Sequence, residues 1–157
     1  MKVSKFGGTS LATAEQIKKV CNIITEDSER QLVVVSAPGK RFKEDIKVTD
    51  LLITCAEKFL SFGEAEEELK AVVERYREIA QGLDLSEDIV NVIESDLRDR
   101  LNMSISNKDK FIDTLKAAGE DNNAKLVAQY LISKGIKSQY VNPGNAGLLL
   151  SDEYGNA

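Results

Sequence analysis

The first 37 residues combine two strand patterns with one helix pattern, and this order restricts the folds that are open to the chain. Residues 2–6 (KVSKF) predict a short strand, and residues from about 11 to 27 predict a helix. The apolar positions of that helix share one face: Ile17, Val20, Cys21 and Ile24. Residues 31–37 (QLVVVSA) form a β-branched run that is typical of a strand buried on both faces of a parallel sheet. The sequence therefore predicts a βαβ unit.

The rest of the chain predicts helices followed by more strands. A helical insertion is expected over about 50–118, and a further helix over about 120–133. Glycine or polar stretches would divide the insertion at three places: Gly63, 81–88 and 102–109. Residues 135–142 (GIKSQYVN) and 146–152 (AGLLLSD) predict two further strands. About four strands with helices between them predict an α/β fold, doubly wound around a mainly parallel sheet.

Composition excludes several classes of partner. The 157 residues contain 21 Lys and Arg against 26 Asp and Glu, a net charge of −5, and no stretch interleaves basic residues with aromatics. We therefore expect no nucleic-acid partner. The longest aliphatic run, 32–35, is far too short for a membrane span, so a cytoplasmic location is the expectation. Cys21 and Cys55 occupy apolar helix positions in a chain without histidine, which indicates buried thiols and predicts no metal site.

The motif KFGGTS follows directly from the first predicted strand and has the chemistry of a phosphate site. Open α/β sheets bind ligands at the carboxyl ends of their strands, and helix starts attract anions. Gly7 and Gly8 would let the backbone approach a ligand closely, while Thr9 and Ser10 add hydroxyl donors. Lys5 would supply a point charge for phosphoryl oxygens. A structural role explains the same residues, since Gly-Gly turns and hydroxyl caps are common, and the residues alone leave both interpretations open.

Four strings in order carry a family resemblance: KFGGTS, VVVSAPG, VTDLL and AAGEDNNAKLVAQYL. Together they closely resemble the aspartate kinases of the amino acid kinase family, from the first residue of the chain to the last. The resemblance implies an αβα sandwich like that of carbamate kinase. It also implies transfer of the γ-phosphoryl group of ATP, carried with Mg²⁺, to the β-carboxylate of L-aspartate. The product, 4-phospho-L-aspartate, begins lysine, threonine and methionine biosynthesis.

The same resemblance assigns roles to individual residues. The lysine that neutralises the transferring phosphoryl group matches Lys5, and the motif's phosphate-binding positions match the residues that follow it: Gly7, Gly8, Thr9 and Ser10. Ser36 and Thr49 match positions that line the phosphoryl and aspartate site. Glu120 matches the glutamate at a helix start that binds the substrate α-amino group. Taken singly, each residue has a structural alternative. Ser36 could end a strand, Thr49 could cap the helix that follows, and Glu120 could be a first-turn carboxylate that the helix dipole stabilises.

Between the second strand and the insertion, residues 38–47 form a long polar loop with mixed charge. Its apolar side chains are Phe42 and Ile46, and we expect the loop to be mobile without ligand.

The resemblance also implies that residues 1–157 are the N-terminal part of an amino acid kinase domain. The nucleotide-binding half and ACT regulatory domains would then be absent, and the 157 residues alone are expected to be inactive. An exposed strand edge predicts self-association, so a homo-oligomer is expected. Two alternatives stay open. One is another amino acid kinase, of the glutamate or acetylglutamate type, and the other is a non-catalytic α/β interaction module.

Overall fold

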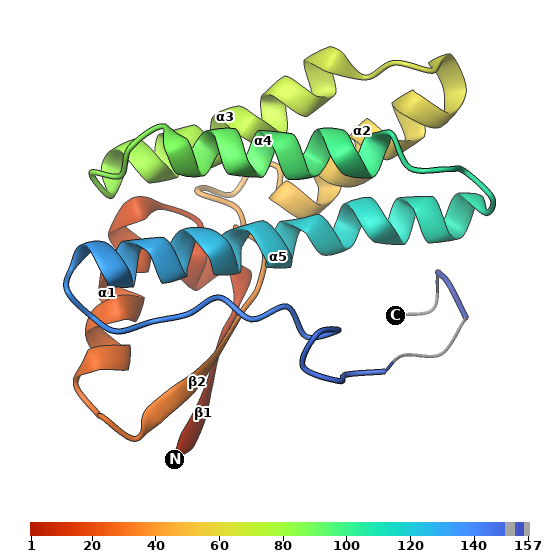
Figure 1. The fold of residues 1–157 in the computed structure, drawn as a ribbon. Helices are drawn as coiled ribbons and strands as arrows, with labels where there is room; N and C mark the ends of the chain where they lie inside the picture. Colours follow the sequence, from red (N-terminus) through yellow and green to blue (C-terminus); the bar gives the residue numbers. More distant parts are fainter. Residues whose placement is uncertain (150–152, 156–157) are drawn as a thin grey trace.

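The fold is that of a computed structural model that describes residues 1–149 and 153–155, and Figure 1 shows its arrangement. The N-terminal part consists of four elements: β1 (Lys2–Phe6), the 3₁₀ turn η1 (Gly8–Leu11), α1 (Ala14–Thr25) and β2 (Arg30–Val35). The two strands pair in parallel, with Lys5 opposite Val34 and Phe6 opposite Val35. The predicted βαβ unit is therefore confirmed. Within the described residues, the sheet consists of these two strands.

Four helices follow β2 and form the upper layer in Figure 1: α2 (Val48–Phe62), α3 (Glu66–Gly82), α4 (Asp88–Leu101) and α5 (Lys108–Ser133). Local chemistry sets several of their ends. Gly63 ends α2 with a φ of 77°, a left-handed conformation that glycine adopts without strain. The Asn107 side chain accepts a hydrogen bond from the Lys110 N–H and begins α5. The three predicted breaks in the helical insertion all lie between these helices.

Gly119 does not end a helix, and the expected break between 118 and 120 is wrong. Helix α5 runs through it without interruption, so Glu120 lies in mid-helix rather than at a helix start. A Cβ at position 119 would lie 2.8 Å from the Ala37 Cβ and 3.2 Å from the Leu52 Cδ1. The glycine is therefore explained by close packing of α5 against the residues after β2 and against α2.

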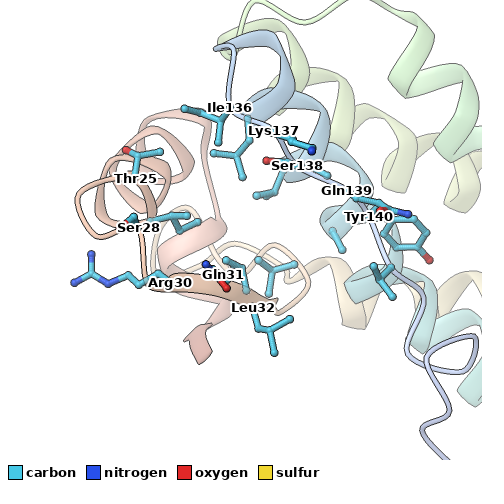
Figure 2. A pocket seen from close by; sticks show the side chains of 18 of the residues that line it. Thr25, Ser28, Arg30, Gln31, Leu32, Ile136, Lys137, Ser138, Gln139 and Tyr140 are labelled. Atoms are coloured by element: carbon cyan, nitrogen blue, oxygen red, sulfur yellow. The ribbon is translucent and has the colours of Figure 1, made fainter. Parts of the chain in front are cut away.

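The strand predicted at 135–142 is absent from the structure, and the described part of the one predicted at 146–152 is also irregular. Residues 150–152 lie outside the described residues. Side-chain bonds to α5 explain the irregular path, because Tyr140 and Asn142 both donate to the Asp121 carboxylate. Between this segment and β2 lies a cavity of about 600 Å³, whose walls include Leu32 and Ile136 (Figure 2).

The sheet has one covered face and one open face. Phe6, Val33 and Val35 pack toward the helices and join the hydrophobic core. On the other face, Val3, Leu32 and Val34 are exposed. The prediction that residues 31–37 are buried on both faces is therefore wrong for this structure.

The core lies mainly among the helices, and its largest fully buried side chain is that of Tyr76. Cys21 and Cys55 are buried free thiols, as predicted, and burial raises the pKa of each to about 11.

None of the helices in the described residues combines the length and apolar character that crossing a bilayer requires.

We expect Gly119→Ala to destabilise the protein. At an exposed mid-helix position this change typically stabilises a helix by up to about 1 kcal/mol. Here the added methyl group would overlap Ala37, and overpacking of this kind costs about 1–3 kcal/mol. Urea unfolding gives the measurement. Combining Gly119→Ala with Ala37→Gly removes the overlapping atom and should recover part of the loss, whereas a more stable Gly119→Ala variant would contradict the packing explanation.

Candidate functional site

Residues 36–39 leave the sheet beside the KFGGTS turn, and hydrogen bonds between the two segments continue the parallel pairing. The Ser36 N–H donates to the Phe6 carbonyl at 3.1 Å, and the Gly39 N–H donates to the Gly8 carbonyl at 2.8 Å. Both segments lie at the carboxyl ends of parallel strands, where α/β sheets usually bind ligands. The structure therefore brings the predicted phosphate turn and Ser36 to one edge of the sheet.

The two glycines of the motif have different surroundings. A Cβ at Gly7 would meet no atom within 4 Å, so this position borders open space. A Cβ at Gly8 would lie 2.9 Å from the Ala37 carbonyl oxygen, and one at Gly39 would lie 2.6 Å from the Gly8 carbonyl carbon. Gly7 thus leaves room for a ligand, whereas Gly8 and Gly39 lack side chains because their backbones touch. The sequence interpretation missed this contact because it treated Gly39 only as part of a loop.

Three further residues of the motif are exposed: Lys5, Thr9 and Ser10. Thr9 and Ser10 lie in η1, and the Ser10 N–H donates to the Gly7 carbonyl at 3.0 Å. Helix α1 begins only at Ala14, so the turn η1 separates the glycines of the motif from that helix, and the expected effect of the α1 dipole stays a prediction. Lys5 lies on the open face of the sheet. No hydrogen bond or ion pair joins its ammonium group to another described residue, so the charge is available to a ligand.

Helix α5 is held against the residues after β2 by contacts on either side of Glu120. The Asn123 side chain donates to the Ser36 carbonyl at 2.7 Å, and Gly119 packs on Ala37. The buried Tyr76 hydroxyl donates to the Gly119 carbonyl at 2.8 Å. Burial, aided by the Glu120 carboxylate, raises the Tyr76 pKa well above its usual value. The exposed Glu120 is therefore presented from mid-helix, close to the Ser36 segment.

Thr49 reaches the same edge through the start of α2. The Val48 N–H donates to the Pro38 carbonyl at 3.1 Å, which joins the first turn of α2 to the segment after β2. Thr49 is the next residue and is half-buried. The structure thus gathers Ser36, Thr49 and the KFGGTS turn, with Glu120 on the adjoining helix. No hydrogen bond or ion pair links Lys5 to Glu120 within the described residues.

The loop over 38–47 is anchored by charge rather than by its apolar side chains. Phe42 and Ile46 are 58% and 52% exposed. Instead, Asp45 is buried and accepts hydrogen bonds from two guanidinium groups, those of Arg41 and Arg75, at 2.9 Å each. No local sequence pattern predicts this pair, since Arg75 lies 30 residues after Asp45 in the chain. The expected mobility of the loop stays a prediction.

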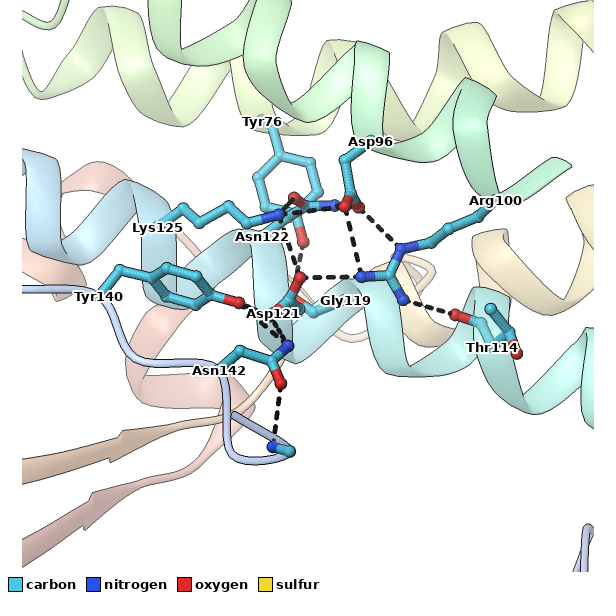
Figure 3. A network of polar contacts seen from close by, with 11 residues as sticks. Tyr76, Asp96, Arg100, Thr114, Gly119, Asp121, Asn122, Lys125, Tyr140 and Asn142 are labelled. Atoms are coloured by element: carbon cyan, nitrogen blue, oxygen red, sulfur yellow. Dashed lines mark hydrogen bonds and ion pairs between the residues drawn. The ribbon is translucent and has the colours of Figure 1, made fainter. Parts of the chain in front are cut away.

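A second polar network, shown in Figure 3, joins α5 to α4 through Asp121, the residue after Glu120 in the sequence. The Asp121 carboxylate accepts from Arg100 of α4 at 2.8 Å and forms an ion pair with Lys125 at 3.0 Å. The same lysine reaches Asp96 of α4 at 3.1 Å. Burial alone would raise the Asp96 pKa, but Arg100, Asn122 and Lys125 together outweigh this effect, and the pKa is lowered. These contacts hold α5 against α4 in the helical turn that carries Glu120, the candidate substrate-binding residue.

The described residues contain no group of three or more His, Cys, Asp or Glu side chains that could hold a metal ion.

Sequence comparison connects this geometry to known proteins. Residues 1–156 match the sequence model of the Amino acid kinase family. Aspartokinase 3 of Bacillus subtilis is 54% identical over 157 residues, which cover all of this chain and 35% of that protein. The aspartokinase of Chlamydia pneumoniae is 32% identical over 155 residues, which cover 99% of this chain and 32% of that protein. The chain therefore spans about a third of the length of these curated relatives.

Solved structures show the same likeness. The aspartate kinase of Clostridium acetobutylicum matches with a TM-score of 0.73 and 34% identity, over 83% of this chain and 29% of that one. Aspartokinase III of E. coli, solved in complex with aspartate and ADP, matches with a TM-score of 0.68 and 26% identity, over 87% and 30%. These matches confirm the predicted α/β fold class and the resemblance carried by the sequence motifs.

Acid should weaken the anchor of the 38–47 loop. Hydrogen bonds from Arg41, opposed by burial and aided by the charge of Arg75, hold the Asp45 pKa well below its usual range. A lowered pKa stabilises the folded state above the unfolded-state value of about 3.9, and this contribution is lost as the pH falls below that value. We expect Asp45→Asn to lower the free energy of unfolding at neutral pH by about 3 kcal/mol, because Arg75 loses its buried partner.

Urea unfolding of the original chain and of Asp45→Asn at several pH values tests this expectation. The difference between the two should narrow as the pH falls below about 4, where the original carboxylate loses its advantage. Asp99 is exposed and forms no ion pair among the described residues, so Asp99→Asn is the matched control. A gap of constant size at every pH would show that Asp45 contributes packing rather than charge.

Proposed function

The chain belongs to the amino acid kinase family, and on that premise we propose that its residues form the phosphate turn and the aspartate side of an aspartate kinase site. In this reaction a β-carboxylate oxygen of L-aspartate attacks the γ-phosphorus of ATP. The new O–P bond forms as the bond to the β,γ-bridging oxygen breaks, and ADP leaves with 4-phospho-L-aspartate as the product. The observation that carries the proposal is the meeting of the KFGGTS turn, Ser36, Thr49 and α5 at one edge of the sheet.

Lys5 and the turn would receive the phosphoryl group. Phosphoryl transfer depends on positioning and on stabilising the negative charge of the transferring group. The Lys5 ammonium group has no described partner that would compete for it, and the open space at Gly7 lets phosphate oxygens approach the backbone. Thr9 and Ser10 would add hydroxyl donors. All these groups act by binding and orienting, so the proposed chemistry needs no proton transfer from the chain.

Glu120, Ser36 and Thr49 would hold the acceptor substrate. A carboxylate is the natural partner of an α-ammonium group, and Glu120 is exposed on the helix that Asn123 and Gly119 fix against the Ser36 segment. The Ser36 and Thr49 hydroxyls would orient the rest of the substrate. The relatives described above are named as aspartokinases, and this supports aspartate over glutamate or acetylglutamate as the acceptor.

ATP would be the phosphoryl donor and would bring Mg²⁺ with it. The E. coli relative was solved with ADP, which supports a nucleotide substrate. A resident metal centre does not fit the described residues, since they lack a cluster of metal ligands. A magnesium ion bound to the nucleotide would neutralise phosphate charge, and Mg²⁺ commonly binds through substrate phosphates and water. A cytoplasmic location and a homo-oligomer stay predictions.

The proposal is testable in a chimera, in which residues 1–157 replace the matching segment of Bacillus subtilis Aspartokinase 3. ADP release that requires both aspartate and ATP would support the proposal. Lys5→Met should then lower kcat by about 10²–10³, because the charge acts mainly on the departing phosphoryl group. Lys19→Met removes an exposed lysine from α1 and should leave kcat unchanged. A Lys5→Met enzyme within about threefold of the parent would refute the assignment of Lys5.

Glu120→Gln should chiefly weaken aspartate binding, since it removes one charge of the proposed pair while keeping the shape of the side chain. The loss expected for a hydrogen bond to a charged group is about 1.5–3 kcal/mol, measured as a rise in the aspartate KM of the chimera. Glu57→Gln changes an exposed glutamate of α2 and serves as the control. An unchanged aspartate KM would leave Glu120 as an ordinary helix-surface residue.

A further inference from the structure

A single residue, Gly39, connects helix α3 with the phosphate turn. Its carbonyl accepts a hydrogen bond from Arg75 Nη2 at 3.0 Å, and its N–H donates to the Gly8 carbonyl at 2.8 Å. The two glycine backbones also touch, so no side chain fits between them. The Arg75 guanidinium is therefore linked to Gly8 through one residue, Gly39.

The same guanidinium holds the far end of the loop. Arg75 Nη1 donates to Asp45 Oδ2 and to the Ile46 carbonyl, both at 2.9 Å. Arg75 is buried, and desolvation lowers its pKa, so these acceptors compensate a costly charge. Outside the buried pair, Arg41 binds Asp45 and reaches Glu78 of α3 at 2.5 Å. The loop is thus tied to α3 at both of its ends.

We propose that Arg75 is a positioning residue for the phosphate turn, acting through Gly39 on the backbone of residues 7–10. The proposal rests on the proposed function, because the turn matters for phosphoryl transfer only if it binds phosphate. An arginine suits this position because its planar fork reaches three acceptors in fixed directions: the Gly39 carbonyl, the Asp45 carboxylate and the Ile46 carbonyl. A lysine supplies the charge without the fork.

Amide hydrogen exchange on the 157-residue chain tests the coupling without any need for activity. In Arg75→Lys, which keeps the buried charge, the Gly39 and Ser10 amides should exchange about tenfold faster, the scale of one lost hydrogen bond. The Ser36 amide, which bonds to Phe6, should not change. Arg77→Lys is the matched control, since Arg77 lies on the same helix and pairs with Glu74 of α3 and with Glu87, the residue before α4.

Asp45→Asn distinguishes the contact of Arg75 Nη1 with Asp45 from the contact of Arg75 Nη2 with the Gly39 carbonyl. It removes the ionic contact at residue 45 but leaves the Gly39 carbonyl bonded to Arg75, so exchange should accelerate at residue 45 and not at Ser10. Faster exchange at Gly39 in Arg75→Lys with an unchanged Ser10 amide would overturn the proposal, because the turn would then be independent of the loop. Equal acceleration at Ser36 would also overturn it, since this would indicate general destabilisation.

Kinetics in the chimera distinguish a positioning role from a structural one. Arg75→Lys should lower kcat/KM for ATP about tenfold through misplacement of the turn, with the aspartate KM held within about twofold. This pattern is the reverse of that expected for Glu120→Gln. A normal kcat/KM for ATP in Arg75→Lys would refute the positioning role. If the chimera without substitutions is inactive, the proposed function fails, whereas the exchange result still decides whether Arg75 holds the turn.

Discussion

Residues 36–39 receive contacts from nearly every part of the fold. β1 and the phosphate turn bond to Ser36 and Gly39, α2 to the Pro38 carbonyl, α3 to the Gly39 carbonyl, and α5 packs on Ala37. Most of these contacts involve backbone atoms. Because backbone groups have fixed directions, a shift of any one element changes the position of this segment for all the others. The backbone of residues 36–39 therefore forms the centre of the candidate site, and the candidate binding side chains lie around it.

Local patterns predicted much of the fold and failed where a distant partner decides the structure. The βαβ unit and the three breaks between helices follow from signals within a few residues, such as Thr13, whose side chain caps the Gln16 N–H. Gly119 was interpreted as a helix end because its packing partner, Ala37, is far away in sequence. Residues 135–142 have the composition of a strand, but Tyr140 and Asn142 bond to Asp121 on α5 instead.

The same distinction applies to the candidate site. The KFGGTS turn, Ser36 and Thr49 were identified from contiguous motifs, and the structure places all of them at one edge of the sheet. The buried Arg75–Asp45 pair and the Asn123 bond to Ser36 were missed, since charged and amide side chains on helices usually face solvent. Only the tertiary arrangement reveals that these side chains hold the segments that carry the motifs.

The contact between Gly8 and Gly39 constrains how this chain can evolve. At each position even a methyl group would meet backbone atoms at less than 3.0 Å, and no repacking of flexible side chains relieves such an overlap. The two positions are closed to substitution individually, and a change at one cannot be compensated by a change at the other, because glycine is already the smallest residue. Within the 38–47 loop, backbone contact alone therefore excludes any side chain at Gly39, whereas an exposed position such as Phe42 is under no such restriction.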